Sequence, residues 1–241
     1  MSRTAVFTAL VLRCRPSGDS NSEVTLLTAE EGIIKATAFG GPKSKLRAHV
    51  SPYNSGQVWI YRDKSKEYGK LSDFDVRSWR PGLRELYERT VAAACAAETI
   101  LSSHGGGGDW RTAFKLAADT LDALENANEE LCASLQIHFL WRWAGFLGIQ
   151  PNLECCAECE QDTALWYNVR ENSALCAGCI KGIEDSHLQP LNSGCRKWLS
   201  AVEQVEPSQL YRYSMDRKSF NEAKSLVTSL LSAQLGKSIS C

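Results

Sequence analysis

Five of the ten cysteines lie between residues 155 and 179, and four of them have a spacing that could hold a metal ion. Cys156 and Cys159 form one CxxC pair, and Cys176 and Cys179 form a second. Two such turns can complete a tetrahedron of thiolates around zinc, with Zn–S distances of about 2.3 Å. Because four sulfur ligands leave no position for water or substrate, the spacing predicts one structural Zn2+.

Two alternatives remain open for these cysteines. Cys155 could replace Cys156 as a ligand, although the CxxC spacing favours Cys156. A CxxC pair could also be a redox couple, but such a motif usually stands alone beside a βαβ unit. The scattered cysteines are best interpreted as small buried apolar residues; they are Cys14, Cys95, Cys132, Cys195 and Cys241.

A second candidate site is the basic loop Phe39–Arg47, which opens with the diglycine Gly40-Gly41. Glycine lets a backbone approach a phosphate closely, and cationic and hydroxyl side chains can then contact it. The candidate residues are Lys35, Lys43, Ser44, Lys45 and Arg47. The alternative is a solvated turn whose lysines protect a sheet edge. The residues alone leave both interpretations open.

Three aromatic residues, Tyr53, Trp59 and Tyr61, follow this loop. Aromatic rings can stack on the bases of single-stranded nucleic acid. Trp59, within the apolar run QVWIY, could equally belong to the hydrophobic core.

Motifs for catalysis are missing from the sequence. It contains no GxxxxGK[ST], no GxGxxG after a strand, no HExxH and no nucleophile elbow. The four histidines are dispersed. We therefore expect no catalytic residues and a protein that is not an enzyme.

The first 80 residues contain five short segments with the composition of strands and no room for crossover helices. This number of strands predicts a small closed antiparallel barrel, and an OB-fold fits it, although an SH3-like barrel fits almost as well by count. The expected strands are Thr4–Cys14, Val24–Thr28, Gly32–Phe39, Gln57–Tyr61 and Lys70–Trp79.

After residue 80 the apolar residues recur at spacings of three and four, which is typical of amphipathic helices. The expected helices are 83–103, one that begins after an N-cap at Asp109, 128–147, 193–205 and 216–235. Leu165–Val169 could form a small hairpin between the two cysteine pairs. The sequence thus predicts an α+β chain: an OB-fold domain at 1–80 and an α-helical domain at 81–241, with a zinc-binding insert at 153–182.

Composition and charge bound the possible functions. No segment approaches the roughly 20 apolar residues of a membrane helix, no export signal is recognisable, and clustered cysteines fit a reducing compartment. We therefore expect a cytoplasmic protein without a membrane partner. The net charge of −1 conceals an asymmetry, because residues 1–80 carry 13 Lys and Arg against 8 Asp and Glu. This excess is a weak indication of an acidic partner.

Taken together, these features resemble the RecO family of bacterial recombination mediators. In that family the first strand pair is followed by a T-x-x-x-G turn and a basic loop, which are similar to Thr28–Gly32 and Gly41–Leu46 here. The long helical domain interrupted by a four-cysteine site is also similar, as is the chain length. The resemblance spans essentially the whole chain.

The resemblance implies a non-enzymatic DNA-repair protein, associated with the nucleoid. Such proteins bind single- and double-stranded DNA, anneal complementary strands, and work with RecR and single-strand-binding protein to load the RecA recombinase. Carried over to this chain, the implied DNA contacts are Lys35, Lys43, Ser44, Lys45 and Arg47. The alternative function is a zinc-ribbon adaptor that binds protein only, with the barrel as a docking module.

Overall fold

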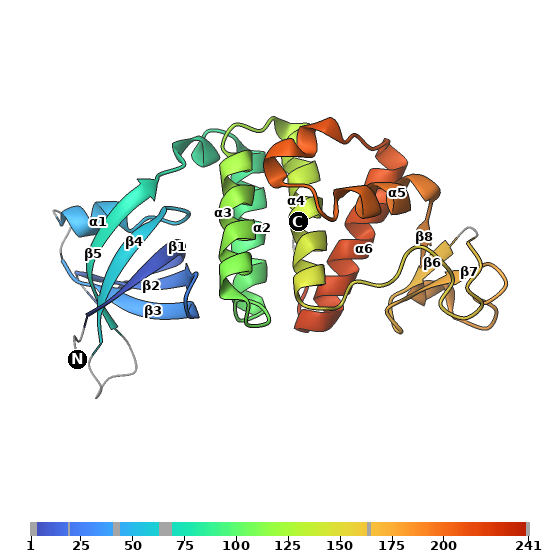
Figure 1. Ribbon diagram of the computed structural model, residues 1–241, viewed down its shortest axis with the longest axis horizontal. Coiled ribbons are helices and arrows are strands. Elements are labelled where there is room, and N and C mark those ends of the chain that lie inside the picture. The colour runs from blue at the N-terminus through green and yellow to red at the C-terminus, as the bar shows by residue number, and fades with distance from the viewer. Residues whose placement is uncertain (1–3, 19, 41–43, 63–68, 163–164, 240–241) are drawn as a thin grey trace. The chain divides into compact units, whose positions relative to one another are not determined.

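The computed structural model describes residues 4–18, 20–40, 44–62, 69–162 and 165–239. The chain forms two compact units, Met1–Asn126 and Ala127–Cys241. The first combines a β-barrel with helices α2 (Tyr87–Ser102) and α3 (Trp110–Leu124), and the second holds the remaining long helices and a small sheet (Figure 1). A domain boundary after residue 80 stays a prediction, since strands give way to helices there within the first unit.

Five strands of the first unit close into a barrel, in the order β1, β2, β3, β5, β4 and back to β1. Neighbouring strands are antiparallel except β3 and β5, which are parallel. The barrel is OB-like, as the sequence predicts. The strands are β1 (Thr4–Ser17), β2 (Asn21–Thr28), β3 (Gly32–Ala38), β4 (Ser55–Tyr61) and β5 (Gly69–Ser78).

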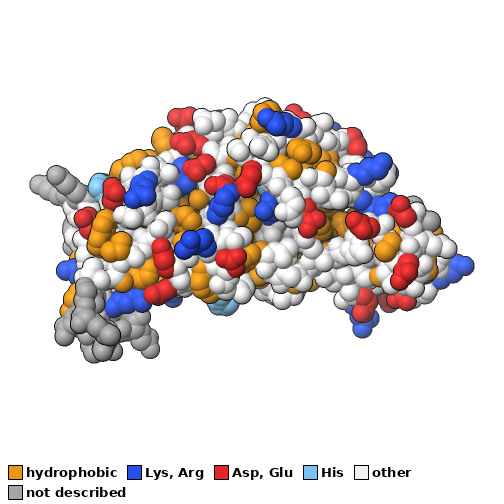
Figure 2. Space-filling model, in the orientation of Figure 1, with side chains coloured by type: hydrophobic (Ala, Val, Ile, Leu, Met, Phe, Trp, Pro, Cys, Tyr) orange, Lys and Arg blue, Asp and Glu red, His pale blue; other side chains and the backbone are white. Residues whose placement is uncertain are grey.

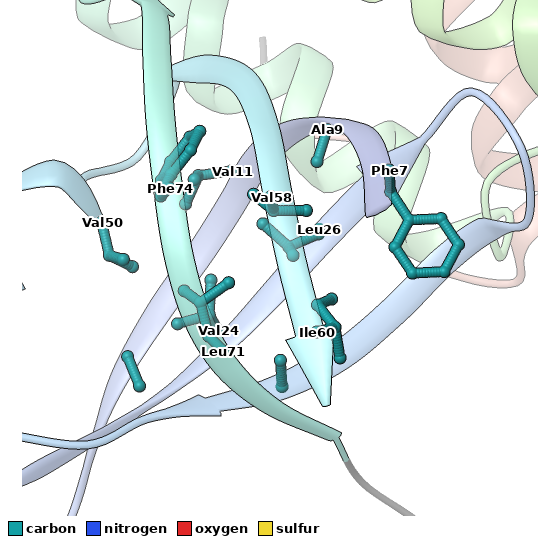
Figure 3. Close-up of a cluster of buried hydrophobic side chains, with 12 residues drawn as sticks. Phe7, Ala9, Val11, Val24, Leu26, Val50, Val58, Ile60, Leu71 and Phe74 are labelled. Carbon is teal, nitrogen blue, oxygen red and sulfur yellow. The ribbon is translucent and has the colours of Figure 1, made fainter. Parts of the chain in front are cut away.

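Alternate residues of each strand point into the barrel and form its hydrophobic core (Figure 3). This alternation follows from the two-residue period of a strand, and the apolar positions of the sequence match it. The labelled core residues are Phe7, Ala9, Val11, Val24, Leu26, Val50, Val58, Ile60, Leu71 and Phe74. Trp59, between Val58 and Ile60, is half-buried and lies outside this core.

The first strand closes the barrel because it is long enough to pair twice. Its first half pairs with β4 and its second half with β2, and the register shifts by one residue at Leu12. A short helix, α1 (Lys45–His49), lies between β3 and β4. Leu46 and Val50 contact the core cluster from this segment. The sequence pattern does not predict α1, because five residues are too few to show a helical period.

Helices α2 and α3 cover the outer side of β1 and β2. Leu10 and Leu27 are register partners that are fully buried although they lie outside the barrel core. The ring of Trp110, at the start of α3, packs on Gly32, where a Cβ atom would come within 2.8 Å of the ring. A side chain at Gly32 would therefore separate α3 from the β2–β3 turn.

A buried arginine joins the barrel to these helices. The side chain of Arg80 is 1% exposed, and its Nε donates to Oδ1 of Asp122 on α3 at 2.7 Å. Its Nη1 donates to the carbonyl of Tyr53 at 2.6 Å and to the hydroxyl of Ser55, on β4, at 3.0 Å. One guanidinium thus satisfies three acceptors from two parts of the unit, which is the way a buried charge is tolerated.

Replacing Arg80 should destabilise the first unit. Arg80→Met leaves the carbonyl of Tyr53 and the hydroxyl of Ser55 without this donor, so we expect the free energy of unfolding to fall by about 2–3 kcal/mol. Urea unfolding followed by circular dichroism measures the change. The matched control is Arg77→Met on the exposed side of β5, which should change stability by less than about 0.5 kcal/mol. Equal effects of the two changes would contradict the role of Arg80.

The observed helices follow the predicted ones with small shifts. A 3-10 turn, η1 (Pro81–Arg84), precedes α2, and α2 starts only at Tyr87 because Leu86 is extended. The carboxylate of Asp109 accepts from the amide of Thr112 at 3.2 Å, which confirms the predicted N-cap of α3. No helix in the described part of the chain is long and apolar enough to cross a membrane.

Three long helices form the core of the second unit: α4 (Glu129–Phe146), α5 (Ser193–Val202) and α6 (Arg217–Leu235). Asn192 caps α5 and Asp216 caps α6, and both side chains accept from the hydroxyl of Ser219. A Cβ atom at Gly194 would lie 2.4 Å from that hydroxyl. The two helix N-termini can therefore share the hydroxyl of Ser219 only because residue 194 has no side chain.

His138 is fully buried in α4, and its Nε2 lies 2.9 Å from the carbonyl of Val205. Burial, and then the positive charge of Arg142, lower the pKa of His138 to about 4. The folded protein therefore keeps this imidazole neutral at pH values where an exposed histidine is charged.

The stability of this unit should depend on pH through His138. Between its ordinary pKa of 6.5 and about 4, the unfolded chain binds a proton that the folded chain does not. The stabilisation is complete above pH 6.5 and is lost as the pH falls through this window, by about 3 kcal/mol. His138→Gln, which keeps a donor but cannot titrate, should flatten the pH dependence of urea unfolding. A variant with an unchanged pH slope would show that other groups cause it.

Candidate metal centre and nucleic-acid interface

Two tight backbone turns carry the paired cysteines of the second unit. In the first, the amide of Glu160 donates to the carbonyl of Cys156 at 2.9 Å. In the second, the amide of Cys179 donates to the carbonyl of Cys176 at 3.0 Å. These local hydrogen bonds direct the two side chains of each pair to one side, as the CxxC spacing predicts.

A small antiparallel sheet holds the two turns together. It has the order β7, β6, β8, with β6 (Leu165–Asn168), β7 (Ser173–Cys176) and β8 (Leu188–Leu191) (Figure 1). Cys176 ends β7, and the amide of Ala157, inside the first turn, donates to the carbonyl of Ala174 in β7 at 2.8 Å. The predicted hairpin is therefore present, and it positions one cysteine pair against the other.

The four thiols meet at one point. The sulfur atoms of Cys156, Cys159, Cys176 and Cys179 all lie within 4.8 Å of one another, and two of them are 3.6 Å apart. A tetrahedral ion bound at about 2.3 Å needs sulfur atoms about 3.8 Å apart. Cys156 and Cys176 are buried, whereas Cys159 is exposed. The cluster can hold one metal ion, which could enter from the exposed side.

The surroundings of the cluster favour thiolates at two positions. Burial opposes a charge on Cys156, but backbone amides, those of Cys176 and Cys159 among them, donate to the sulfur and lower its pKa to about 6. Backbone amides of Cys179 and Gly178 lower the pKa of Cys176. The neighbouring thiols raise the pKa of Cys179 to about 12. Four negative charges cannot gather here without a cation, which fits a metal-binding set of thiols.

The remaining described cysteines lie apart from this cluster. Asn152 donates to the sulfur of Cys155 at 3.8 Å, so the structure places Cys156, and not Cys155, with the other three thiols. Burial raises the pKa of Cys14 to about 11 and that of Cys195 to about 12. Such protonated thiols are poor nucleophiles and poor metal ligands.

Cations gather on the outer face of the barrel. Following the strand registers, Arg13 lies opposite Thr25 and Thr25 opposite Lys35. The next row runs from Arg15 on β1 through β2 and β3 to Lys70 on β5. The four cations come from three strands, and strand pairing places them on one side of the barrel, with Thr25 between Arg13 and Lys35 and with Glu23 and Thr37 between Arg15 and Lys70.

We call these four residues, Arg13, Arg15, Lys35 and Lys70, the cationic face. Arg13 forms an ion pair with Glu98 on α2. Among the residues that the structure describes, no carboxylate lies within ion-pair distance of Arg15, Lys35 or Lys70, and all three are exposed. Glu23 is the one acidic residue between them in the register. Unpaired, exposed cations of this kind can contact a phosphate backbone.

The structure describes only part of the basic loop that the sequence analysis proposed as a phosphate-binding site. Lys43 lies outside the described residues, and of Lys45 only the backbone, in α1, is described. Ser44 is the extended residue before α1, and Arg47 is exposed on that helix. Lys35 is exposed on β3. The loop residues and Lys35 thus belong to successive elements of the barrel, and their contact with DNA stays a prediction.

Sequence reasoning did not place Arg15 and Lys70 in this site. Their position depends on which residues of β1, β3 and β5 pair. The alternation of Arg13 and Arg15 along β1 was the available indication, since residues two apart share a face. On the face of the molecule in Figure 2, side chains of both signs are interspersed. The distribution of charge over the surface therefore does not reveal the cationic face. The pairing of the strands identifies it.

Comparison with known proteins shows the relationship of this chain. The family model described as "Recombination protein O N terminal" matches residues 1–79, and "Recombination protein O C terminal" matches residues 84–240. The chain belongs to the RecO family. Together the two matches cover nearly the whole RecO-like sequence, and they meet where the barrel ends.

Three relatives illustrate the similarity, and each is described as "DNA repair protein RecO". The protein of Pelotomaculum thermopropionicum is 31% identical over 176 residues, which are 71% of this chain and 67% of the relative. That of Bacillus subtilis is 27% identical over 223 residues, 90% of this chain and 84% of its own. That of Anaeromyxobacter dehalogenans is 27% identical over 238 residues, 97% and 92% of the two chains.

Metal content tests the thiol cluster of this RecO-family chain. Cys176→Ser removes a buried thiol, so we expect the variant to lose its bound metal ion and local order in 153–182. Elemental analysis of purified protein gives the ratio of metal to chain, and the near-ultraviolet dichroism reports local order. The matched control is Cys155→Ser, which should keep one metal ion per chain. A Cys176→Ser protein with a full complement of metal would overturn the four-thiol site.

Proposed function

We propose that this chain is a non-enzymatic DNA-repair protein that binds single- and double-stranded DNA and anneals complementary strands. The observation that carries the proposal is the set of exposed cations Arg15, Lys35 and Lys70 on the outer face of an OB-like barrel, where no carboxylate of the described residues pairs with them. Membership of the RecO family supports it, because the curated relatives are named as DNA repair proteins.

The proposed contact is with the phosphate backbone. Lysine and arginine side chains on a sheet can neutralise phosphates without reading base edges, so binding does not depend on sequence. The proposed DNA contacts also include the loop residues Lys43, Ser44, Lys45 and Arg47, which the resemblance to the RecO family implies. Each phosphate that is contacted releases counterions, and affinity therefore falls steeply with salt.

Annealing follows from holding two strands at once. If one strand lies on the cationic face and a second on the helical unit or on another copy of the protein, their effective concentration rises. Pairing then becomes a local event. The protein supplies no bond-forming groups in this scheme, which is why we propose no catalytic residue.

We propose Zn2+ as the metal of the thiol cluster. Four cysteine sulfurs in a closed set are the ligands typical of structural zinc, and the spacing within the cluster supports this choice. A bound ion would neutralise the thiolates and cross-link the two turns. The residues that would hold it are Cys156, Cys159, Cys176 and Cys179, and they leave no position for substrate.

The proposed partners follow from the proposed role. The chain would act with RecR on DNA coated by single-strand-binding protein and would help to load RecA on the exposed strand. These steps take place on bacterial DNA, so we propose a cytoplasmic, nucleoid-associated location. The family relationship supports these partners, and each needs its own binding experiment.

Removing the loop cations should weaken DNA binding. We expect the triple change Lys43→Ala, Lys45→Ala and Arg47→Ala to lower affinity for a fluorescent oligonucleotide. The slope of log affinity against log salt should also become shallower, by about 0.7 for each phosphate of a single strand that the variant no longer neutralises. Fluorescence anisotropy across a salt series measures both. Annealing of the complementary oligonucleotide, followed in the same samples, should slow in parallel.

The matched control replaces three exposed cations of the second unit, Arg217, Lys218 and Lys237, with alanine. It removes the same charge, and we expect it to bind DNA like the wild type. Weaker binding in the control alone would move the DNA contact to the helical unit. A wild-type protein that binds no DNA at low salt would favour the alternative of an adaptor that binds protein only.

A further inference from the structure

An exposed phenylalanine lies at the edge of the cationic face. Phe39 keeps 45% of its surface exposed, whereas the other phenylalanines named in the barrel, Phe7 and Phe74, are 4% and 1% exposed. Leaving so large an apolar ring in water has a free-energy cost and gives nothing to the barrel core. The ring is therefore available to a ligand.

The strand alternation explains why this ring points outward. Ala36 and Ala38 of β3 belong to the barrel core, so the residues between and after them point to the other side. Lys35 is exposed on that side, four residues before Phe39 on the same segment. The aromatic ring and the exposed Lys35 thus share one surface.

A cation lies against the ring itself. The Nζ atom of Lys70, on β5, is 5.5 Å from the centre of the Phe39 ring. Lys70 reaches this position because Thr37 and Lys70 are register partners in the parallel β3–β5 pair. This cation–π contact orients both side chains and places an apolar ring and a positive charge next to each other.

The pair matches the chemistry of one nucleotide. A base offers an aromatic face that can stack on a ring, and its phosphate offers a negative charge to an ammonium group. Inside duplex DNA both faces of each base are covered by neighbouring pairs, so away from the duplex ends the ring has nothing to stack on. Only an unpaired strand presents both groups together.

We infer that Phe39 stacks on a base of single-stranded DNA and makes the cationic face prefer single strands to duplex. This inference rests on the proposed DNA binding and adds a specificity-determining residue to it. Stacking uses the face of the base and leaves its pairing edge free. A strand held in this way remains competent to pair with its complement.

The test compares three ligands of equal length: a single-stranded oligonucleotide, the same phosphate backbone carrying abasic sites, and the duplex. Phe39→Leu keeps an apolar side chain but removes the aromatic face. We expect it to bind the single strand about 5- to 150-fold more weakly, which corresponds to about 1–3 kcal/mol for one stacked base. Affinity for the abasic strand and the duplex should stay within about twofold of the wild type, because the phosphate contacts are unchanged.

Three further variants separate the effects. Phe39→Trp keeps an aromatic face and, unlike Phe39→Leu, should prefer the single strand as the wild type does. Lys70→Ala should weaken binding to all three ligands and reduce the salt slope by about 0.7 for the single strand and about 0.9 for the duplex. Tyr211→Leu is the matched control, since Tyr211 is 65% exposed and also has a cation, Arg212, over its ring at 5.4 Å. It lies in the second unit and should leave all three affinities unchanged.

The inference is overturned if Phe39→Leu binds the single strand as tightly as the wild type, or if its affinity for all three ligands falls equally. Equal thermal melting of the variant and the wild type excludes misfolding as the cause of either result. A wild-type protein that binds none of the three ligands would overturn the proposed function itself. Binding by the wild type without a stacking effect would overturn only the role of Phe39.

Discussion

The arrangement of the first unit depends on one buried guanidinium. Arg80 stands at the point where the last strand gives way to the helices, and it donates to the end of the loop before β4, to β4 and to α3. A charged group with 1% exposure is stable only when its donors are satisfied. Arg80 therefore links strand β4 of the barrel to helix α3, which covers β1 and β2. Moving either would leave a buried charge without its partners.

In the second unit, the cysteine cluster can stabilise the short segment between α4 and α5. The segment between α4 and α5 has only three short strands of four residues each, so it has little apolar surface to bury. Four thiols that converge within 4.8 Å allow a metal ion to replace the missing core. The turns that carry the cysteines are local, but the segment is also held to the helices. Arg196 of α5 donates to the carbonyl of Leu153 at 3.1 Å, and Gln189 of β8 donates to the hydroxyl of Ser229 on α6 at 2.7 Å.

Closure of the barrel creates the surface that we propose for DNA. A closed sheet has no free edges, and its inner positions are filled by apolar side chains, so any function must lie on its outer side. Part of that side is covered by α2 and α3. The uncovered part carries Arg15, Lys35 and Lys70 beside the exposed ring of Phe39. Backbone binding and base stacking would then be separate contributions from neighbouring strands of one surface.

The sequence by itself determined the features that depend on local spacing. The two CxxC pairs, the five strands, the N-cap at Asp109 and the change from strands to helices all follow from residues a few positions apart. Only the tertiary structure decided the order of the strands around the barrel, the convergence of the two distant cysteine pairs at one point and the burial of Arg80. It also decided which cations become neighbours, because a register is set by pairing between distant segments, and a shift of one residue would turn every side chain of a strand to the opposite face.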